Sequence, residues 1–152
     1  MPVVSQLIDY TGKPVVTLYV TMGETDAEDR RGRGFIVPGP LKVLALVDTG
    51  AGRSQVDLTI LEQLGLRPNG EEDVFTASTG KNSESRDIYV VNLAFAGDRP
   101  GALANDLPVI GTDSLAGLKV EMLLGRDVLD CCLLAYDGPN RRFSLAYDAP
   151  PG

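Results

Sequence analysis

The sequence contains no histidine, and this absence decides which side chains are available for chemistry. It excludes, within one chain, Ser-His and Cys-His nucleophile pairs and every metal site that includes histidine. The only cysteines, Cys131 and Cys132, are neighbours in the chain and make a poor zinc site on their own. Carboxylates, lysines, tyrosines and hydroxyl groups are therefore left as groups that could act in catalysis.

Among the carboxylates, Asp48 stands in the most informative context. It follows the apolar run Leu41–Val47 and precedes Thr49 and Gly50. Such a triplet arises by chance in roughly one chain in fifteen of this length, and an ordinary turn with the aspartate as an Asx-turn former is the alternative interpretation. A charge at the end of a buried strand is costly unless it is paired, which favours a carboxylate with a function.

A second motif lies further along the chain. Residues Met122–Leu129 repeat the order of two apolar residues followed by glycine. The two motifs, in this order and separation, resemble those of the retropepsins, the retroviral proteases and their bacterial single-domain relatives. The resemblance extends from about Leu41 to Tyr147 and is strongest at Leu46–Ala51 and Leu123–Leu129.

The resemblance implies a role for each residue of the first motif. Asp48 matches the catalytic aspartate, and Thr49 matches a residue whose hydroxyl braces two active-site loops across a dimer. Gly50 would let the backbone approach the carboxylate and the substrate closely, where a Cβ would obstruct it. Ala51 would keep the adjacent floor of the substrate site small.

The second motif has implied roles as well. Leu123–Gly125 resembles the strand that passes behind the catalytic loop, and Arg126 opens the short C-terminal helix of the family. Retroviral proteases often carry an acidic residue where this chain has Gly52, and that acid pairs with the arginine matching Arg126. Here Asp57 or Asp127 would have to replace it.

The chemistry of this family needs two carboxylates that hold one water molecule and share one proton. The ionised carboxylate takes a proton from the water while the protonated one polarises the scissile carbonyl. The chain has no second Asp-Thr-Gly or Asp-Ser-Gly, because the segments at 113–115 and 137–138 lack the glycine or the hydroxyl residue. Asp48 of a second copy must supply the partner, which predicts an active site on the two-fold axis of a homodimer.

Family members also cover the substrate with a β-hairpin that gates access. The matching region is Thr76–Arg86, with a tip at Thr79–Asn82, so Thr79 and Gly80 are predicted to bind substrate. An ordinary polar hairpin loop is the alternative, because this tip lacks the apolar, glycine-rich character of retroviral hairpins.

Short segments rich in β-branched residues outnumber helical ones and predict an all-β domain spanning residues 1–152, a closed β-barrel or sandwich with one or two short helices. A helix is expected at Leu58–Leu66, begun by Asp57 and ended by Gly65. Leu41–Val47 reads as a strand buried on both faces, and the first two strands form either a hairpin or successive strands. The expected strands are Val3–Ile8, Val15–Val20, Leu41–Val47, Val74–Ala77, Ile88–Phe95, Pro108–Ile110, Val120–Leu124, Cys131–Tyr136 and Arg142–Tyr147.

Three polar or unusual segments lie between these elements. Gly23–Gly34 is predicted to be a surface loop, and its arginines favour a solvated loop over an RNA-binding or phosphate-binding motif because acidic residues precede them. The acidic segment Glu71–Asp73 is predicted to form a solvated turn. Cys131 and Cys132 are expected to pack in the core or in a subunit contact.

Composition limits the partners. The net charge of -7 over 152 residues argues against nucleic acid and anionic membrane as partners, since a polyanion would be repelled. No apolar run is long enough to span a membrane, and Met1–Tyr10 lacks the features of a signal peptide. Adjacent cysteines lie too close for the usual disulfide, so a reducing, cytoplasmic location is expected.

The leading prediction is therefore a homodimeric aspartic endopeptidase that cleaves a polypeptide substrate, works best below neutral pH and needs no metal or cofactor. One alternative is a retropepsin-like domain that binds peptides or dimerises without turnover, suggested by Gly52 and the polar hairpin tip. Another is a monomer that never brings two carboxylates together.

Overall fold

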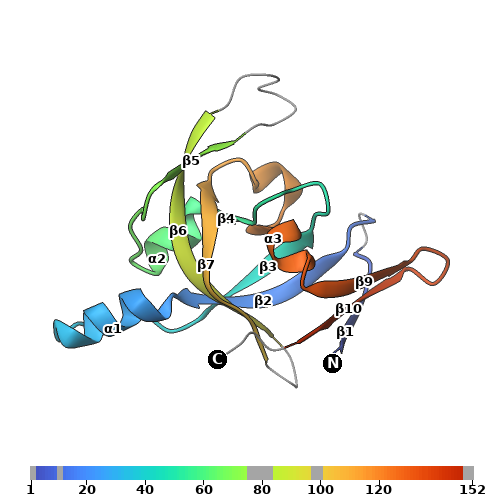
Figure 1. The fold of residues 1–152 in the computed structure, drawn as a ribbon. Coiled ribbons are helices and arrows are strands. Elements are labelled where there is room, and N and C mark those ends of the chain that lie inside the picture. Colours follow the sequence, from blue (N-terminus) through green and yellow to red (C-terminus); the bar gives the residue numbers. More distant parts are fainter. Residues whose placement is uncertain (1–2, 10–11, 75–83, 97–100, 149–152) are drawn as a thin grey trace.

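The computed structural model describes residues 3–9, 12–74, 84–96 and 101–148 (Figure 1). In these residues the α-helices are α1 (Glu24–Gly32), α2 (Leu58–Gln63) and α3 (Arg126–Leu129), with a 3-10 turn at Ala116–Leu118. The strands are β1 (Val3–Leu7), β2 (Val15–Met22), β3 (Leu41–Val47), β4 (Gln55–Asp57), β5 (Glu71–Val74), β6 (Glu84–Phe95), β7 (Ala102–Thr112), β8 (Met122–Leu124), β9 (Cys132–Asp137) and β10 (Arg142–Tyr147).

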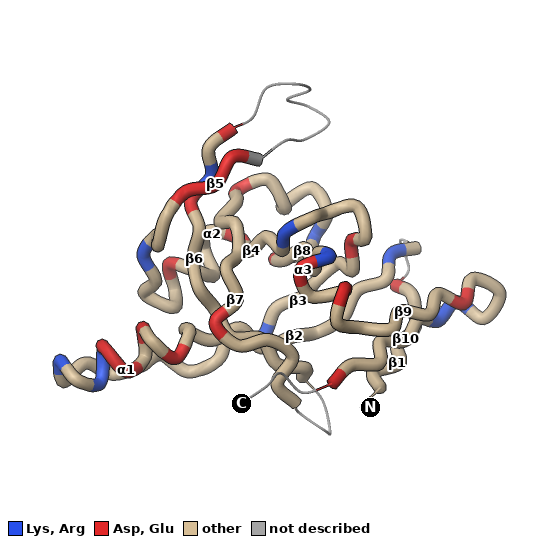
Figure 2. The backbone as a smooth tube through the Cα atoms, in the orientation of Figure 1, with Lys and Arg blue, Asp and Glu red and all other residues tan. Residues whose placement is uncertain are grey.

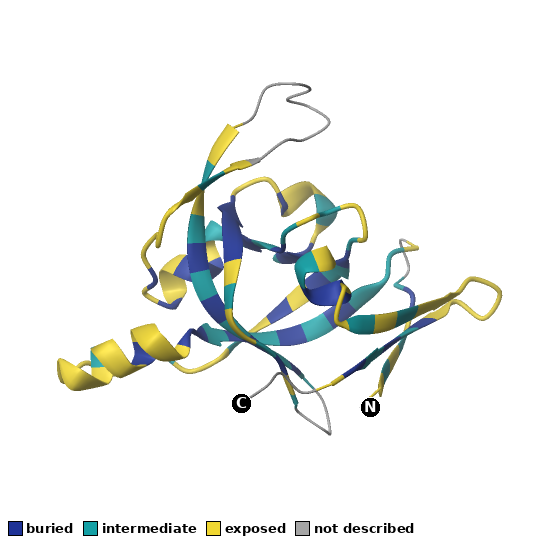
Figure 3. Ribbon diagram, viewed as in Figure 1, coloured by how far each residue is buried: buried dark blue, intermediate teal, exposed yellow. Residues whose placement is uncertain are grey.

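The larger sheet closes on itself. Its strands follow the order β2-β3-β8-β4-β7-β6, and β6 pairs back onto β2 in antiparallel register, with Val20 opposite Leu93. Alternate residues of β2 and β6 are buried, which places one face of each strand in the barrel interior (Figure 3). This arrangement confirms the predicted all-β closed barrel, because alternation of burial with period two is what a barrel strand requires.

A second sheet lies beside the barrel and contains β1, β10 and β9 in that order (Figure 1). β1 pairs with β10, so the first two strands of the chain are successive strands and do not form a hairpin with each other. Phe143 and Leu145 on β10 are buried and join this sheet to the barrel core.

The helix α2 begins at Leu58 as the sequence predicted and ends at Gln63, three residues before the predicted Leu66. Both of its ends are decided locally. Asp57 accepts a hydrogen bond from the Thr59 amide at 2.8 Å, which satisfies a free N–H of the first turn. Gly65 has φ +71° and follows the last turn, and the amide of Leu66 donates to the carbonyl of Leu61 at 3.1 Å. Both ends therefore match the predicted caps.

The prediction of a surface loop at Gly23–Gly34 is wrong, because this segment contains α1. Gly23 offers no capping side chain, and instead the carboxylate of Asp106 on β7 accepts a hydrogen bond from the Glu24 amide at 2.9 Å. Ala27 is the only buried residue of α1, so the segment lacks an apolar stripe. Glu24 and Asp26 stand in its first turn and Arg30 and Arg31 in its last turn (Figure 2), and these four positions suit the helix dipole.

The expectation that Leu41–Val47 is buried on both faces is also wrong. Val43, Ala45 and Val47 point inward, whereas Lys42 is exposed and Leu44 is 41% exposed. The outer face of this strand is therefore only partly covered by other segments, which composition alone could not reveal.

The segment Glu71–Asp73 forms most of strand β5 and is not a turn. Of the predicted hairpin region Thr76–Arg86, the structure describes Glu84–Arg86 as the beginning of β6, while Thr79 and Gly80 lie outside the described residues.

The cysteines take different environments. Cys131 is exposed, which excludes it from the core, and Cys132 packs half-buried against the core as predicted. Burial, reinforced by the neighbouring Cys131, raises the pKa of the Cys132 thiol. Within the described ranges, no helix is long and apolar enough to cross a membrane.

Candidate active site

Asp48 stands where two parallel strands of the barrel end. β3 pairs in parallel with β8, with Val47 opposite Leu124, and the Asp48 amide continues this ladder by donating to the carbonyl of Leu124 at 2.9 Å. The backbone of Asp48 is thus fixed by the sheet, while its side chain is half-buried. We call residues 48–54 the Asp48 loop.

The first turn of this loop is built around the carboxylate. The Gly50 amide donates to Oδ1 of Asp48 at 2.9 Å, and the Ala51 amide donates to the Asp48 carbonyl at 3.2 Å. The Asx turn of the alternative interpretation is therefore present, yet it occupies one carboxylate oxygen only. The other oxygen accepts no hydrogen bond from the described part of the chain, so it is available to a ligand.

Gly50 approaches the carboxylate closely and has no unusual backbone angle. A Cβ built on Gly50 would lie 3.2 Å from Oδ1 of Asp48, so the carboxylate would have to give by a few tenths of an ångström. Thr49 and Gly50 are exposed in the single chain, and Ala51 is half-buried. The predicted residues Asp48, Thr49, Gly50 and Ala51 therefore lie together in one exposed turn.

Gly125 lies directly behind the Asp48 loop. A Cβ at this position would lie 2.8 Å from the Ala51 carbonyl oxygen and 2.9 Å from the carbonyl carbon of Arg53. The Arg126 amide also donates to the Ala51 carbonyl at 2.8 Å. The two motifs of the sequence thus meet back to back, and glycine is the residue that allows this distance.

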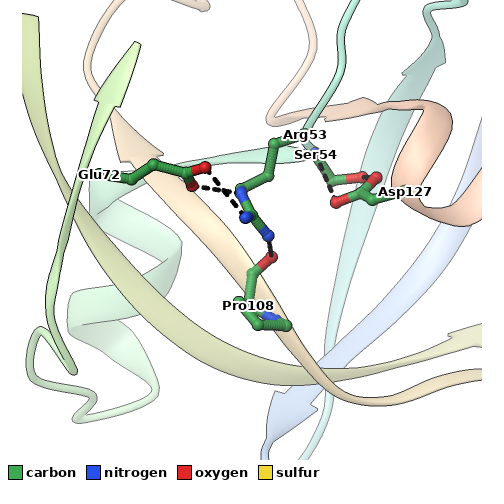
Figure 4. A network of polar contacts seen from close by, with 5 residues as sticks. All are labelled: Arg53, Ser54, Glu72, Pro108 and Asp127. Atoms are coloured by element: carbon green, nitrogen blue, oxygen red, sulfur yellow. Dashed lines mark hydrogen bonds and ion pairs between the residues drawn. The ribbon is translucent and has the colours of Figure 1, made fainter.

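A buried polar network, which sequence reasoning missed, fixes the far end of the loop (Figure 4). Ser54 is 0% exposed, and its hydroxyl donates to Asp127 at 2.7 Å and accepts from the Gly125 amide at 2.9 Å. The Ser54 amide also donates to the Asp127 carboxylate at 2.8 Å. Asp127 follows the predicted Gly-Arg pair, which could have marked it, whereas nothing in the local sequence distinguishes Ser54.

Within the residues that the structure describes, Arg126 forms no ion pair of the kind found in the retroviral family. Its guanidinium donates to the Thr49 carbonyl at 2.8 Å, and none of the ion pairs formed within the described residues includes it. Asp57 is occupied by the cap of α2, and Asp127 by Ser54. Neither of the two proposed replacements for the missing acid at Gly52 therefore serves as that partner.

A second charged residue of the loop does have a partner. Arg53 forms an ion pair with Glu72 on β5, and the Nη2 group of Arg53 donates to Glu72 at 3.0 Å (Figure 4). Glu72 was predicted to be a solvated residue of a turn. It instead links β5 to the Asp48 loop through its ion pair with Arg53.

The sequence matches a family model described as aspartyl protease over residues 36–128, which includes both motifs. The chain belongs to the aspartyl protease family. Among solved structures, this family member is similar to a retropepsin-like aspartic protease from Rickettsia conorii, with 14% identity and a TM-score of 0.60 over 98% of this chain and 94% of that chain. The likeness confirms a retropepsin-like fold. No curated protein matches the sequence.

Within the described ranges, no group of three or more histidine, cysteine, aspartate or glutamate side chains is placed to hold a metal ion. The chemistry that the described site offers is that of a carboxylate and of the backbone groups around it.

Proposed function

We propose that the chain, over residues 1–152, is an aspartic endopeptidase that hydrolyses peptide bonds as a homodimer. The observation that carries this proposal is the placement of Asp48, whose backbone is fixed in the β3–β8 ladder while one carboxylate oxygen stays available at an exposed turn. One carboxylate is half of the required pair, so a second copy of Asp48 completes the site.

The mechanism follows from the charge on two neighbouring carboxylates. Both cannot ionise easily at this separation, so the pair holds one proton between them. The ionised Asp48 takes a proton from a bound water, and the protonated Asp48 of the other subunit polarises the scissile carbonyl. Because this singly protonated state is required, activity is greatest below neutral pH.

The neighbouring residues have supporting roles in this proposal. The exposed hydroxyl of Thr49 braces the corresponding loop of the second subunit, and Gly50 and Ala51 leave room for the substrate backbone. Thr79 and Gly80, which lie outside the described residues, bind the substrate in this proposal. The chain needs no metal or cofactor for these steps, and its partners are a second copy and a polypeptide, not nucleic acid or membrane. The adjacent cysteines suit the cytoplasm.

The proposal is tested with Asp48→Asn. Asparagine can still accept the hydrogen bond from the Gly50 amide, so the fold is expected to persist while peptide cleavage by the purified protein is abolished. Asp113→Asn is the matched control, because Asp113 is exposed and belongs to the incomplete Asp-Ser motif. Cleavage that is unchanged in Asp48→Asn would overturn the proposal.

A second candidate function is a retropepsin-like dimerisation or peptide-binding domain without turnover. The absence of an acid at Gly52 and the lack of an ion pair at Arg126 within the described residues favour it. A peptide library assayed from acid to neutral pH, with a pepstatin-like inhibitor, separates the two functions. Sedimentation at micromolar concentration shows in addition whether dimers form, and a strictly monomeric chain would exclude the peptidase and the dimerisation domain.

A further inference from the structure

Arg53 and Ser54 leave the Asp48 loop on opposite sides (Figure 4). Ser54 points to Asp127 and is buried, as described above. Arg53 points the other way, to Glu72 on β5 and to the carbonyl of Pro108 on β7, where its Nη1 group lies 3.5 Å from the oxygen. We call Arg53, Glu72 and Pro108 the Arg53 bridge. It joins three segments that are distant in the sequence.

The contact between Arg53 and Glu72 is geometrically demanding. Two nitrogens of the guanidinium, Nε and Nη2, each meet a different oxygen of the carboxylate. Among the described residues, the bond from Nη2 is the hydrogen bond of this pair, and Nε and the second carboxylate oxygen are a charge contact without hydrogen-bond geometry. The side chains are 33% and 39% exposed, but Nε and the oxygen that faces it are buried, so the two charges depend on each other for a partner.

The position of β5 gives this contact its importance. β5 is the last strand of the larger sheet, and its strand partner is β6. The ladder of these two strands continues through Asn69 and Gly70, which exchange hydrogen bonds with Ile88 of β6. The base of this hairpin is fixed to the Asp48 loop through the barrel, because Ile88 of β6 lies opposite Ile110 of β7 and the Ile110 amide donates to the Ser54 carbonyl at 3.0 Å. β5 lies on the far side of β6 from this contact, and in the described part of the chain the Arg53 bridge links β5 itself to the loop through side chains.

We propose that Arg53 is a positioning residue that holds β5 at a set distance from the Asp48 loop and so determines the width of the substrate site between them. This inference rests on the proposed peptidase function. A substrate backbone lying between the loop and the hairpin is bound well only when both sides are in place. Loss of the bridge is expected to weaken substrate binding and to leave the Asp48 chemistry nearly intact.

The test uses Glu72→Gln, which keeps the shape of the side chain and removes its charge. Glu84→Gln is the control, because Glu84 pairs with Arg86 at 2.6 Å inside β6 of the same hairpin, although the Glu84 side chain is more exposed, at 52% against 39% for Glu72. Peptide cleavage is measured for both variants. We expect KM to rise about fivefold in Glu72→Gln with kcat within about twofold of the unmodified protein, and both constants to stay within about twofold in Glu84→Gln.

Amide hydrogen exchange of β5 provides a readout that does not need activity. It is measured on full-length protein carrying Asp48→Asn, with and without Glu72→Gln. Exchange in β5 is expected to become about three to ten times faster in Glu72→Gln and to change less than twofold in Glu84→Gln. Arg53→Lys is expected to retain part of the protection that Arg53→Gln loses.

Unchanged exchange in β5, or equal changes in Glu72→Gln and Glu84→Gln, would overturn the Arg53 bridge. Faster exchange with an unchanged KM would overturn its role in substrate binding. If the unmodified protein cleaves no peptide, the proposed function fails, and the exchange experiment then decides by itself whether Arg53 positions β5.

Discussion

Ser54→Ala is the substitution for which the structure gives the clearest magnitude. The Ser54 hydroxyl is buried and makes two hydrogen bonds, one to a carboxylate and one from the Gly125 amide. Losing the bond to the charged Asp127 costs about 1.5–3 kcal/mol, and leaving the buried amide without an acceptor costs about 1–3 kcal/mol. Because such terms overlap, we expect a loss of about 3 kcal/mol in the free energy of unfolding.

Ser85→Ala is the matched control for this experiment. Ser85 also donates to a carboxylate, that of Glu71 at 3.1 Å, but on the exposed surface of the β5–β6 hairpin. Its removal is expected to change the free energy of unfolding by less than about 0.5 kcal/mol. The comparison therefore isolates burial as the reason for the larger effect.

Both variants are compared by urea denaturation in the Asp48→Asn background, so that proteolysis of unfolded chains does not contribute. One protein concentration is used throughout, because association shifts apparent stability. A loss below about 1 kcal/mol in Ser54→Ala, or a loss equal to that of Ser85→Ala, would refute the conclusion that this network anchors the Asp48 loop.

Three further predictions concern single positions. Gly125→Ala is expected to destabilise the protein by about 2–3 kcal/mol, because the new Cβ would overlap backbone atoms of the Asp48 loop. Gly117→Ala is the control and is expected to cost less than about 0.5 kcal/mol, since no atom lies within 4 Å of its new Cβ. Equal midpoints of urea denaturation for the two variants would contradict this prediction. In Asp106→Gly, glycine adopts the positive φ of 48° found at this position, but the side chain that caps α1 is lost. Amide exchange in the first turn of α1 is therefore expected to become about fivefold faster, which corresponds to about 1 kcal/mol. Unchanged exchange would refute the capping role of Asp106. At neutral pH a thiol reagent is expected to label Cys131 before Cys132. Cys131 is exposed, whereas burial raises the pKa of the Cys132 thiol and so lowers the fraction of Cys132 that is present as thiolate. Equal labelling rates in the two single-cysteine variants would contradict this order.

Elements whose signals are local could be predicted from the sequence. The helix α2 carries both of its caps within its own segment, at Asp57 and Gly65. The turn at Asp48 is also local, because the aspartate bonds to an amide two residues away. The resemblance of two short motifs to those of the retropepsins indicated the family, and the excess of short β-branched segments over helical ones indicated the barrel or sandwich.

Elements whose signals come from elsewhere in the chain could not be predicted in this way. The helix α1 is capped by Asp106, which is 82 residues away from Glu24, and it buries only one side chain. Arg53 and Ser54 stand next to each other, yet nothing in their sequence indicates that one is half-exposed and the other fully buried.

The amino-acid sequence by itself determined which groups are available for chemistry and which residue bears the candidate carboxylate. It did so because the absence of histidine and the turn chemistry of Asp-Thr-Gly depend on residue type and short spacing. Only the tertiary structure decided how the loop that carries this carboxylate is held, through Gly125 behind the loop, Asp127 at one side and Glu72 at the other. Those contacts join segments far apart in the chain, and their partners are selected by the closure of the barrel, which no local pattern encodes.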